Sequence, residues 1–425
     1  MQDNGFSDCL PIPTVRDEGH TGRRSGGHTV MRNTSIRRRA VAPLVGIALA
    51  CGLSACGSDS SSDGGDAGSG SDASTNVGAT GADIDADIDA ELAADFKGTF
   101  TAPPTSAPTP AADANVWVVP CGKVVAGCQA PAEGAVEAGE ALGWTMTIAD
   151  GALGVGDGYS VAIRQAVAAK ADAIIVTGID CDYAKGGLQA AKDAGIPTIL
   201  FGGFDCDDTP LFTTEVKLSE EYPSFGDFLK AWGAAKARWL INATDGKAKV
   251  INTVVTDSRT ARYPSEGFAD ELAKSCPDCG IVDNLEFQVA DVAGPLAQKF
   301  SAILLSNPDA NAIQPTFDSF ILAGSMPQAI ASTGRKMTII GGEGLAPGIS
   351  LIHAEQVGAA IGWDNGWAGW GAIDTTIRVL AGEDTVPQGW GWQTVDADHD
   401  LPADGEGYTT GFDFRSAYKA AWGIS

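Results

Sequence analysis

Short apolar runs recur along the middle of this 425-residue chain, separated by stretches with helical spacing, and this rhythm restricts the folds open to it. The runs are continuous rather than alternating, which is typical of strands buried on both faces of a parallel sheet. Their starts recur at roughly 25–30 residues, the length of one strand–helix unit. In the first half the predicted strands are Val116–Val119, Thr145–Ile148, Ala173–Val176 and Ile196–Phe201. These units predict a doubly wound α/β lobe.

The same rhythm repeats after a long predicted helix over 222–242. The predicted strands here are Ala248–Val255, Ile281–Val289, Ala312–Gln314, Met337–Ile340 and Val357–Ile361. A helix over 364–380 and an irregular C-terminal segment follow. We therefore predict an α/β protein of two doubly wound parallel-sheet lobes joined by a hinge. A crevice should lie at the carboxyl ends of the strands, where open α/β sheets bind ligands.

The first 55 residues have the pattern of an export signal. Met31 begins a basic stretch, and it is also an alternative start of the chain. The apolar run over 40–53 is too short to span a bilayer as a stable helix. The segment Leu53–Cys56 resembles the lipobox of bacterial lipoproteins, which implies that Cys56 is lipidated and anchors the protein outside the cytoplasm, on the bacterial cell membrane. An ordinary signal peptide with an incidental cysteine is the alternative.

Residues 56–112 are predicted to be a disordered tether and linker. The stretch over 57–82 is rich in Gly, Ser and Asp and has too little apolar surface to offset the entropy of ordering. A short acidic helix is predicted over 84–96, and the proline-rich stretch over 102–110 should be extended. Folded structure is expected from about Asn115.

Six of the nine cysteines lie beyond the leader and Cys56. An even number in an oxidising compartment favours disulfides. Proximity in sequence favours the pairs Cys121–Cys128, Cys181–Cys206 and Cys276–Cys279. Other pairings stay open, because six cysteines permit about 15 connectivities. The spacing of Cys276 and Cys279 is thioredoxin-like, but the pair follows a predicted helix instead of opening one, which favours a structural disulfide.

Several function classes have no support in the sequence. The net charge of −26 repels phosphate backbones, so nucleic acid is not an expected partner. No nucleophile elbow, phosphate-binding loop or His-Glu-x-x-His motif occurs, so we expect no catalytic residues and no cofactor. His353 and His399, the histidines beyond the leader, lie far in sequence from any cysteine pair, so no metal site is expected.

Four segments resemble type I periplasmic sugar-binding proteins, the ribose- and galactose-binding components of ABC importers. Residues 171–176 and 190–198 are similar to the first lobe of that family. Residues 262–268 resemble its Arg-x-x-x-x-Gly-Phe turn, and 339–344 its Gly-x-Asp-Gly turn. The resemblance runs from about Asn115 to Leu380. It implies that three crossovers join the lobes, with lobe 1 formed by 113–218 and 364–388, and lobe 2 by 219–363 and 389–425.

The resemblance also implies which residues contact the ligand. These are Arg262, Glu343, Asp318, Phe317, Trp363 and Asp205. Arg262 stands at the family's ligand-binding arginine, whose rigid fork of donors suits paired oxygens. Glu343 replaces an aspartate, and Trp363 stands where glutamine is common. These departures mean that a pentose ligand is not implied. A surface arginine, a solvated acid and a packing tryptophan are the plain alternatives.

The leading hypothesis is a monomeric receptor that closes its lobes around a small, sugar-like polar solute and delivers it to an ABC permease. A sensory receptor that docks on a membrane signalling protein is the second hypothesis. An enzyme on the same scaffold, with Glu343 or Asp318 as a base, is the third.

Overall fold

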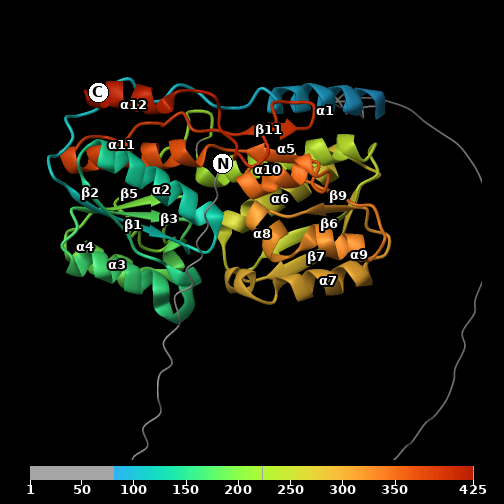
Figure 1. Ribbon diagram of the computed structural model, residues 1–425, viewed down its shortest axis with the longest axis horizontal. Helices are drawn as coiled ribbons and strands as arrows, with labels where there is room; N and C mark the ends of the chain where they lie inside the picture. Colours follow the sequence, from blue (N-terminus) through green and yellow to red (C-terminus); the bar gives the residue numbers. More distant parts are fainter. Residues whose placement is uncertain (1–80, 223, 425) are drawn as a thin grey trace, which may run out of the picture. The chain divides into compact units, whose positions relative to one another are not determined.

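The computed structural model describes residues 81–222 and 224–424, which form two α/β lobes, each built on a parallel sheet (Figure 1). The predicted fold class is therefore confirmed. The leader over 1–55 and the expected lipidation site Cys56 lie outside the described residues. Within the described part of the chain, no helix is both long and apolar enough to cross a membrane.

Lobe 1 contains a five-stranded sheet of order β2-β1-β3-β4-β5. Its strands are β1 (Asn115–Pro120), β2 (Thr145–Ile148), β3 (Ala173–Thr177), β4 (Thr198–Phe201) and β5 (Thr214–Glu215). Its helices are α2 (Ala126–Ala141), α3 (Gly158–Ala168), α4 (Lys185–Asp193) and α11 (Asn365–Ala381). Helices α2 and α11 cover one face, and α3 and α4 cover the other (Figure 1). The strands serve both faces, since Val118 and Val119 point into different core clusters.

Lobe 2 contains a four-stranded sheet of order β7-β6-β8-β9. Its strands are β6 (Lys249–Val255), β7 (Gly280–Phe287), β8 (Ala312–Gln314) and β9 (Thr338–Ile339). Its helices are α5 (Phe225–Ala243), α6 (Arg259–Ser275), α7 (Leu296–Ser306), α8 (Asp318–Ala323), α9 (Met326–Ser332) and α10 (Ala346–His353). Helices α5 and α6 pack on one face of this sheet, while α7, α9 and α10 contribute to the core on the other.

The C-terminal segment, expected to be irregular, contains a strand and a helix. Strand β10 (Ala359–Gly362) pairs antiparallel with β11 (Gln393–Asp396), and a parallel bridge between Ile340 and Ala359 joins this pair to lobe 2. Helix α12 (Phe414–Trp422) packs instead against α11 of lobe 1, where Trp422 stacks on Trp370 at 5.2 Å. The tail over 389–425 is thus shared between the lobes, whereas the sequence analysis assigned all of it to lobe 2.

Three chain crossings connect the lobes. They lie between β5 and α5, between β10 and α11, and between α11 and β11. The first and third are hydrogen-bonded to each other, because Gln388 N and Trp390 N both donate to the carbonyl of Leu218, at 3.1 and 3.0 Å. The hinge therefore contains two crossover segments that are joined by backbone hydrogen bonds.

Residues 81–114 pack against the lobes, where the sequence analysis expected a linker with a short acidic helix over 84–96. Helix α1 (Gly81–Asp95) buries Ile88 and Leu92 in the main core. Its Asp95 accepts two hydrogen bonds, 2.7 and 2.8 Å long, from Arg238 of α5. Residues 99–101 then pair with 389–392 through backbone hydrogen bonds. Two apolar side chains, one ion-paired acid and a few backbone hydrogen bonds therefore hold this polar segment on the lobes.

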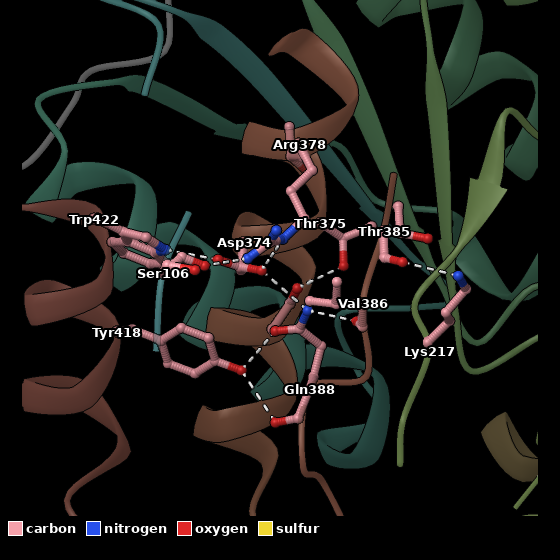
Figure 2. A network of polar contacts seen from close by, with 12 residues as sticks. Ser106, Lys217, Asp374, Thr375, Arg378, Thr385, Val386, Gln388, Tyr418 and Trp422 are labelled. Carbon is pink, nitrogen blue, oxygen red and sulfur yellow. Dashed lines mark hydrogen bonds and ion pairs between the residues drawn. The ribbon is translucent and has the colours of Figure 1, made fainter. Parts of the chain in front are cut away.

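A buried polar network lies behind the third crossover (Figure 2). The carboxylate of Asp374 accepts hydrogen bonds from Arg378 Nε at 2.8 Å, Gln388 Nε2 at 3.0 Å and Trp422 Nε1 at 2.9 Å. Tyr418 donates to Gln388 Oε1 at 2.8 Å. Because Asp374 is fully buried and both oxygens are bonded, the network ties α11, α12 and the crossover into one unit.

The disulfide pairing expected from sequence proximity is the one observed: Cys121–Cys128, Cys181–Cys206 and Cys276–Cys279. The first two staple loops at the carboxyl ends of lobe 1 strands. The third closes the turn after α6.

Candidate ligand-binding site

A cavity of about 110 Å³ lies between the lobes, at the carboxyl ends of their strands. Thr177 ends β3 and Phe201 ends β4 in lobe 1, while Phe317 and Glu343 follow β8 and β9 in lobe 2. A single buried water needs only about 10–15 Å³ by the same measure, so the space suits a small organic ligand. Its position is the crevice that the sequence analysis predicted.

Aromatic side chains make up much of the cavity wall. They are Phe201, Phe225, Phe317, Phe320, Trp363 and Trp390. Trp363 stacks on Trp232 with ring centroids 4.7 Å apart and lies 5.1 Å from Trp390. Trp232 in turn stacks on Phe317 at 5.7 Å. Rings fixed in this way offer flat, rigid surfaces to a ring or an alkyl group of a ligand.

The cavity has one ionisable lining side chain among the described residues, that of Glu343. Glu343 is 1% exposed, and its Oε2 accepts a hydrogen bond from Asp318 N at 2.9 Å. Its Oε1 lies against Gly127 of lobe 1, where a Cβ would come within 2.5 Å of it. Glycine at 127 therefore lets α2 approach this carboxyl group.

Asp318 and Lys236 lie next to Glu343 in lobe 2. The Asp318 carboxylate accepts hydrogen bonds from Gly342 N and Leu345 N, both 2.7 Å long, and so fixes the turn that carries Glu343. Lys236 donates to the carbonyls of Pro315 and Thr316, and its Nζ lies 4.0 Å from the Trp232 ring centroid. All three ionisable groups are buried.

Burial shifts the protonation of this trio. It raises the pKa of Glu343 to about 8, and the neighbouring Asp318 carboxylate adds to the rise. Burial also raises the pKa of Asp318, against its hydrogen bonds from Gly342 and Leu345. The pKa of Lys236 is lowered to about 7 by burial, with the two acids opposing the shift. The free site therefore favours a protonated Glu343 at neutral pH.

Arg259, at the start of α6, bonds lobe 2 to lobe 1 beside the cavity. Its guanidinium donates to Asp207 Oδ1 at 2.9 Å and to the carbonyl of Asp205 at 2.8 Å. Its backbone N–H donates to Asp180 Oδ2 at 2.8 Å. Thr260 Oγ1 adds a bond of 3.1 Å to the Gly202 carbonyl. These contacts, which we call the latch, hold the lobes in a closed arrangement.

The structure separates the six predicted contact residues into three groups. Glu343, Phe317 and Trp363 line the cavity. Asp318 lies behind the wall, with both oxygens directed to backbone N–H groups. The other two, Arg262 and Asp205, lie outside the cavity lining.

Arg262 and Asp205 have other partners. Arg262 is ion-paired with Glu266 one turn along its own helix, and its side chain is 42% exposed. It faces the acidic depression next to the cavity. The Asp205 carboxylate accepts from Cys206 N and Leu211 N and so shapes the loop that receives Arg259.

Several site residues were missed by the sequence analysis. Thr177 ends β3 with a hydroxyl that is buried and has no hydrogen-bond partner in the described part of the chain. Trp390 lies in the third crossover itself, in a Gly-rich stretch without a strand or helix pattern. Arg259 lies one turn before Arg262 and directly follows Ser258, the N-cap of α6, which was the available signal.

One known protein family matches this chain. The family model described as a periplasmic binding protein domain matches residues 116–384. A search of curated proteins found no match.

Solved structures share the fold. A glucose–galactose binding protein from Geobacillus stearothermophilus is 22% identical, with a TM-score of 0.57 over 68% of this chain and 99% of its own. A Mycobacterium smegmatis ABC transporter solute binding protein with bound glycerol is 17% identical, with a TM-score of 0.59 over 70% and 99%. A Caulobacter myo-inositol binding protein is 17% identical, with a TM-score of 0.56 over 68% and 94%.

Proposed function

The chain belongs to the periplasmic binding protein family, and from that premise we propose that it binds a sugar or polyol between its lobes and delivers it to an ABC permease. The observation that carries the proposal is the cavity between the lobes at the strand ends, with aromatic rings from both lobes and one carboxyl group. Rings stack on the apolar faces of sugar rings, and hydroxyl and carboxyl groups bind their oxygens. The similarity to sugar- and polyol-binding structures supports the same ligand class.

The proposed mechanism is hinge closure. A ligand that contacts Phe201 and Thr177 of lobe 1 together with Glu343 and Phe317 of lobe 2 has its full set of contacts only when the lobes are closed. It therefore shifts the population toward the closed state, in proportion to its affinity for that state over the open one. The permease would read the closed arrangement, and the ligand would leave chemically unchanged.

The cellular setting is also a proposal. The lipobox-like segment ending at Cys56 would hold the protein on the outer side of the bacterial cell membrane, as a monomer next to its permease. Globomycin-sensitive processing and labelling with a radioactive fatty acid, both lost in Cys56→Ala, would test the anchor.

The binding proposal is tested with a ligand panel. Purified protein is titrated with glucose, galactose, arabinose, myo-inositol and glycerol while intrinsic fluorescence and thermal stability are recorded. We expect at least one ligand to change the fluorescence, because Trp363 and Trp390 line the cavity, and to raise the melting temperature.

Matched variants locate the effect. Trp363→Ala should weaken binding at least tenfold, whereas Leu305→Ala, a change at a 75% exposed residue of α7, should leave it unchanged. Small-angle scattering should report compaction on ligand addition. Absence of any response across a wide panel of sugars and polyols would refute the proposal.

A further inference from the structure

The cavity differs from a site built for a neutral polyhydroxylated ligand in how its charge and polarity are distributed. Six of its lining residues are aromatic, and Glu343 is its one ionisable lining group among the described residues. Among the described residues, no lysine, arginine or histidine lines the cavity to neutralise the charge of Glu343. An array of aromatic rings around a single carboxyl group is the arrangement that attracts organic cations, through the ring faces and the negative charge together.

The two oxygens of Glu343 are not equivalent. Oε2 is bonded to Asp318 N, but Oε1 takes no hydrogen bond from another residue in the described part of the chain. Because Glu343 lines the cavity at 1% exposure, Oε1 is a buried acceptor available to a ligand. A donor on a ligand that meets this oxygen would stabilise the buried carboxylate.

When Glu343 is ionised, the buried charges beside the cavity lack one cation. Lys236 is the only basic group in the buried trio, and both of its hydrogen bonds go to backbone carbonyls, of Pro315 and Thr316. Two acids and one base leave an excess negative charge whenever Glu343 is ionised. The first turn of α2, which approaches Glu343 from lobe 1, brings no ionisable group to it. A positive charge in the cavity would complete the balance.

We propose that the ligand carries an ammonium group, which binds Glu343 Oε1 inside the aromatic wall, on a hydroxylated body. The hydroxyl of Thr177 is the contact for that body, because it is 2% exposed, lines the cavity from lobe 1 and has no partner in the described part of the chain. An amino sugar or amino alcohol has both features. This inference rests on the proposed function, since it names the chemical class of the ligand for the same cavity.

The acidic residues beside the cavity also favour a cationic ligand. The neighbouring depression is lined by Asp180, Asp182, Asp207 and Asp257, with Arg259 and Arg262 as its basic groups. The whole chain has a net charge of −26. An acidic rim and a negative protein both raise the local concentration of cations and repel anions. Sugar acids and sugar phosphates are therefore poor candidates.

The test compares ligands that differ mainly in charge. Choline is titrated against 3,3-dimethylbutan-1-ol, its uncharged carbon analogue, and glucosamine against glucose, by calorimetry near neutral pH. We expect the charged member of each pair to bind at least tenfold more tightly. Equal or tighter binding of the neutral members would overturn the inference and leave the proposed function standing. If neither these ligands nor the wider sugar and polyol panel binds, the proposed function falls with it.

Two further measurements make the test specific to Glu343. The affinity for choline, whose charge does not titrate, should increase at least tenfold between about pH 6 and about pH 9, because Glu343 ionises and Lys236 loses its proton over that range. Glu343→Gln should abolish both the pH dependence and the preference for the charged ligand. The control Asp309→Asn removes one exposed acid in the turn between α7 and β8, outside the cavity lining, and should retain both. A pH-independent affinity in the unmodified protein would overturn the inference even if the Gln variant failed to fold.

Discussion

Two buried carboxyl groups, Asp374 in lobe 1 and Glu343 in lobe 2, have opposite surroundings. Asp374 is 0% exposed, and its two oxygens accept three hydrogen bonds, one of them from the guanidinium of Arg378 (Figure 2). Glu343 is 1% exposed, but one of its oxygens is bonded only to a backbone N–H and the other faces the cavity. A buried acid whose bonds are complete holds the fold together, whereas one whose bonds are incomplete is available to a ligand.

The largest expected effect comes from breaking the complete network. Asp374→Ala leaves Arg378 buried without its counter-charge and removes the acceptor of Gln388 and Trp422, so the free energy of unfolding should fall by about 3–5 kcal/mol. Urea unfolding followed by circular dichroism measures it. Asp309→Asn should stay within about 0.5 kcal/mol of the unmodified protein. A loss below about 1 kcal/mol for the Ala variant would mean that the network does not stabilise the fold as described.

The second prediction concerns how the stability conferred by Glu343 depends on pH. Its pKa in the folded protein, about 8, lies above the ordinary value, so the folded state keeps a proton that the unfolded state has already lost. The free energy of unfolding should therefore decrease as the pH rises from about 5 to about 8, by up to about 1.4 kcal/mol per pH unit from this group.

The difference between the unmodified protein and Glu343→Gln isolates that contribution, because the remaining groups are common to both. Gln should be the more stable form near neutral pH, and the difference should level off above about pH 8. Parallel stability curves for the two proteins would contradict a raised pKa at Glu343.

A smaller effect is expected at the latch. Arg259→Ala removes the bonds to Asp207 and to the Asp205 carbonyl, but Arg259 and Asp207 are 17% and 83% exposed, so solvent screens their ion pair. A loss of about 1 kcal/mol corresponds to roughly fivefold weaker ligand binding. Calorimetry gives the affinity, and small-angle scattering of the ligand-free variant should show more open molecules. An unchanged affinity with unchanged scattering would show that the latch does not hold the lobes together.

The smallest effect is expected at Arg262. Its ion pair with Glu266 lies on one helix surface and is worth about 0.3–0.5 kcal/mol. Arg262→Ala should change ligand affinity less than about twofold in the same calorimetric titration. A large loss would instead place Arg262 in contact with the ligand, as the family resemblance implies.

The sequence predicted the two lobes well because continuous apolar runs indicate strands that are buried on both faces. Such strands are typical of parallel sheets covered by helices. It predicted the location of the cavity for the same reason, since strand ends position Phe317, Glu343 and Trp363. It predicted a short acidic helix over 84–96, close to α1, but not that this helix packs on the core through Ile88 and Leu92.

Side-chain direction explains the other differences. Arg259 and Arg262 are one helical turn apart, and the sequence does not reveal which of them reaches lobe 1. Similarly, no pattern of residue types shows that Glu343 Oε1 lies at the cavity without a hydrogen bond from another described residue. Such details depend on atoms brought together from distant parts of the chain.

The segment before β1 has a mechanical consequence. Asp95 is bonded to α5 of lobe 2, residues 99–101 to the third crossover, and the Ser106 carbonyl to Arg378 of lobe 1. A force applied through the upstream chain would thus enter lobe 2 first, then the crossover, and lobe 1 last. Any rotation of one lobe against the other must also bend or detach the segment over 95–106. This segment therefore limits how far the lobes can open.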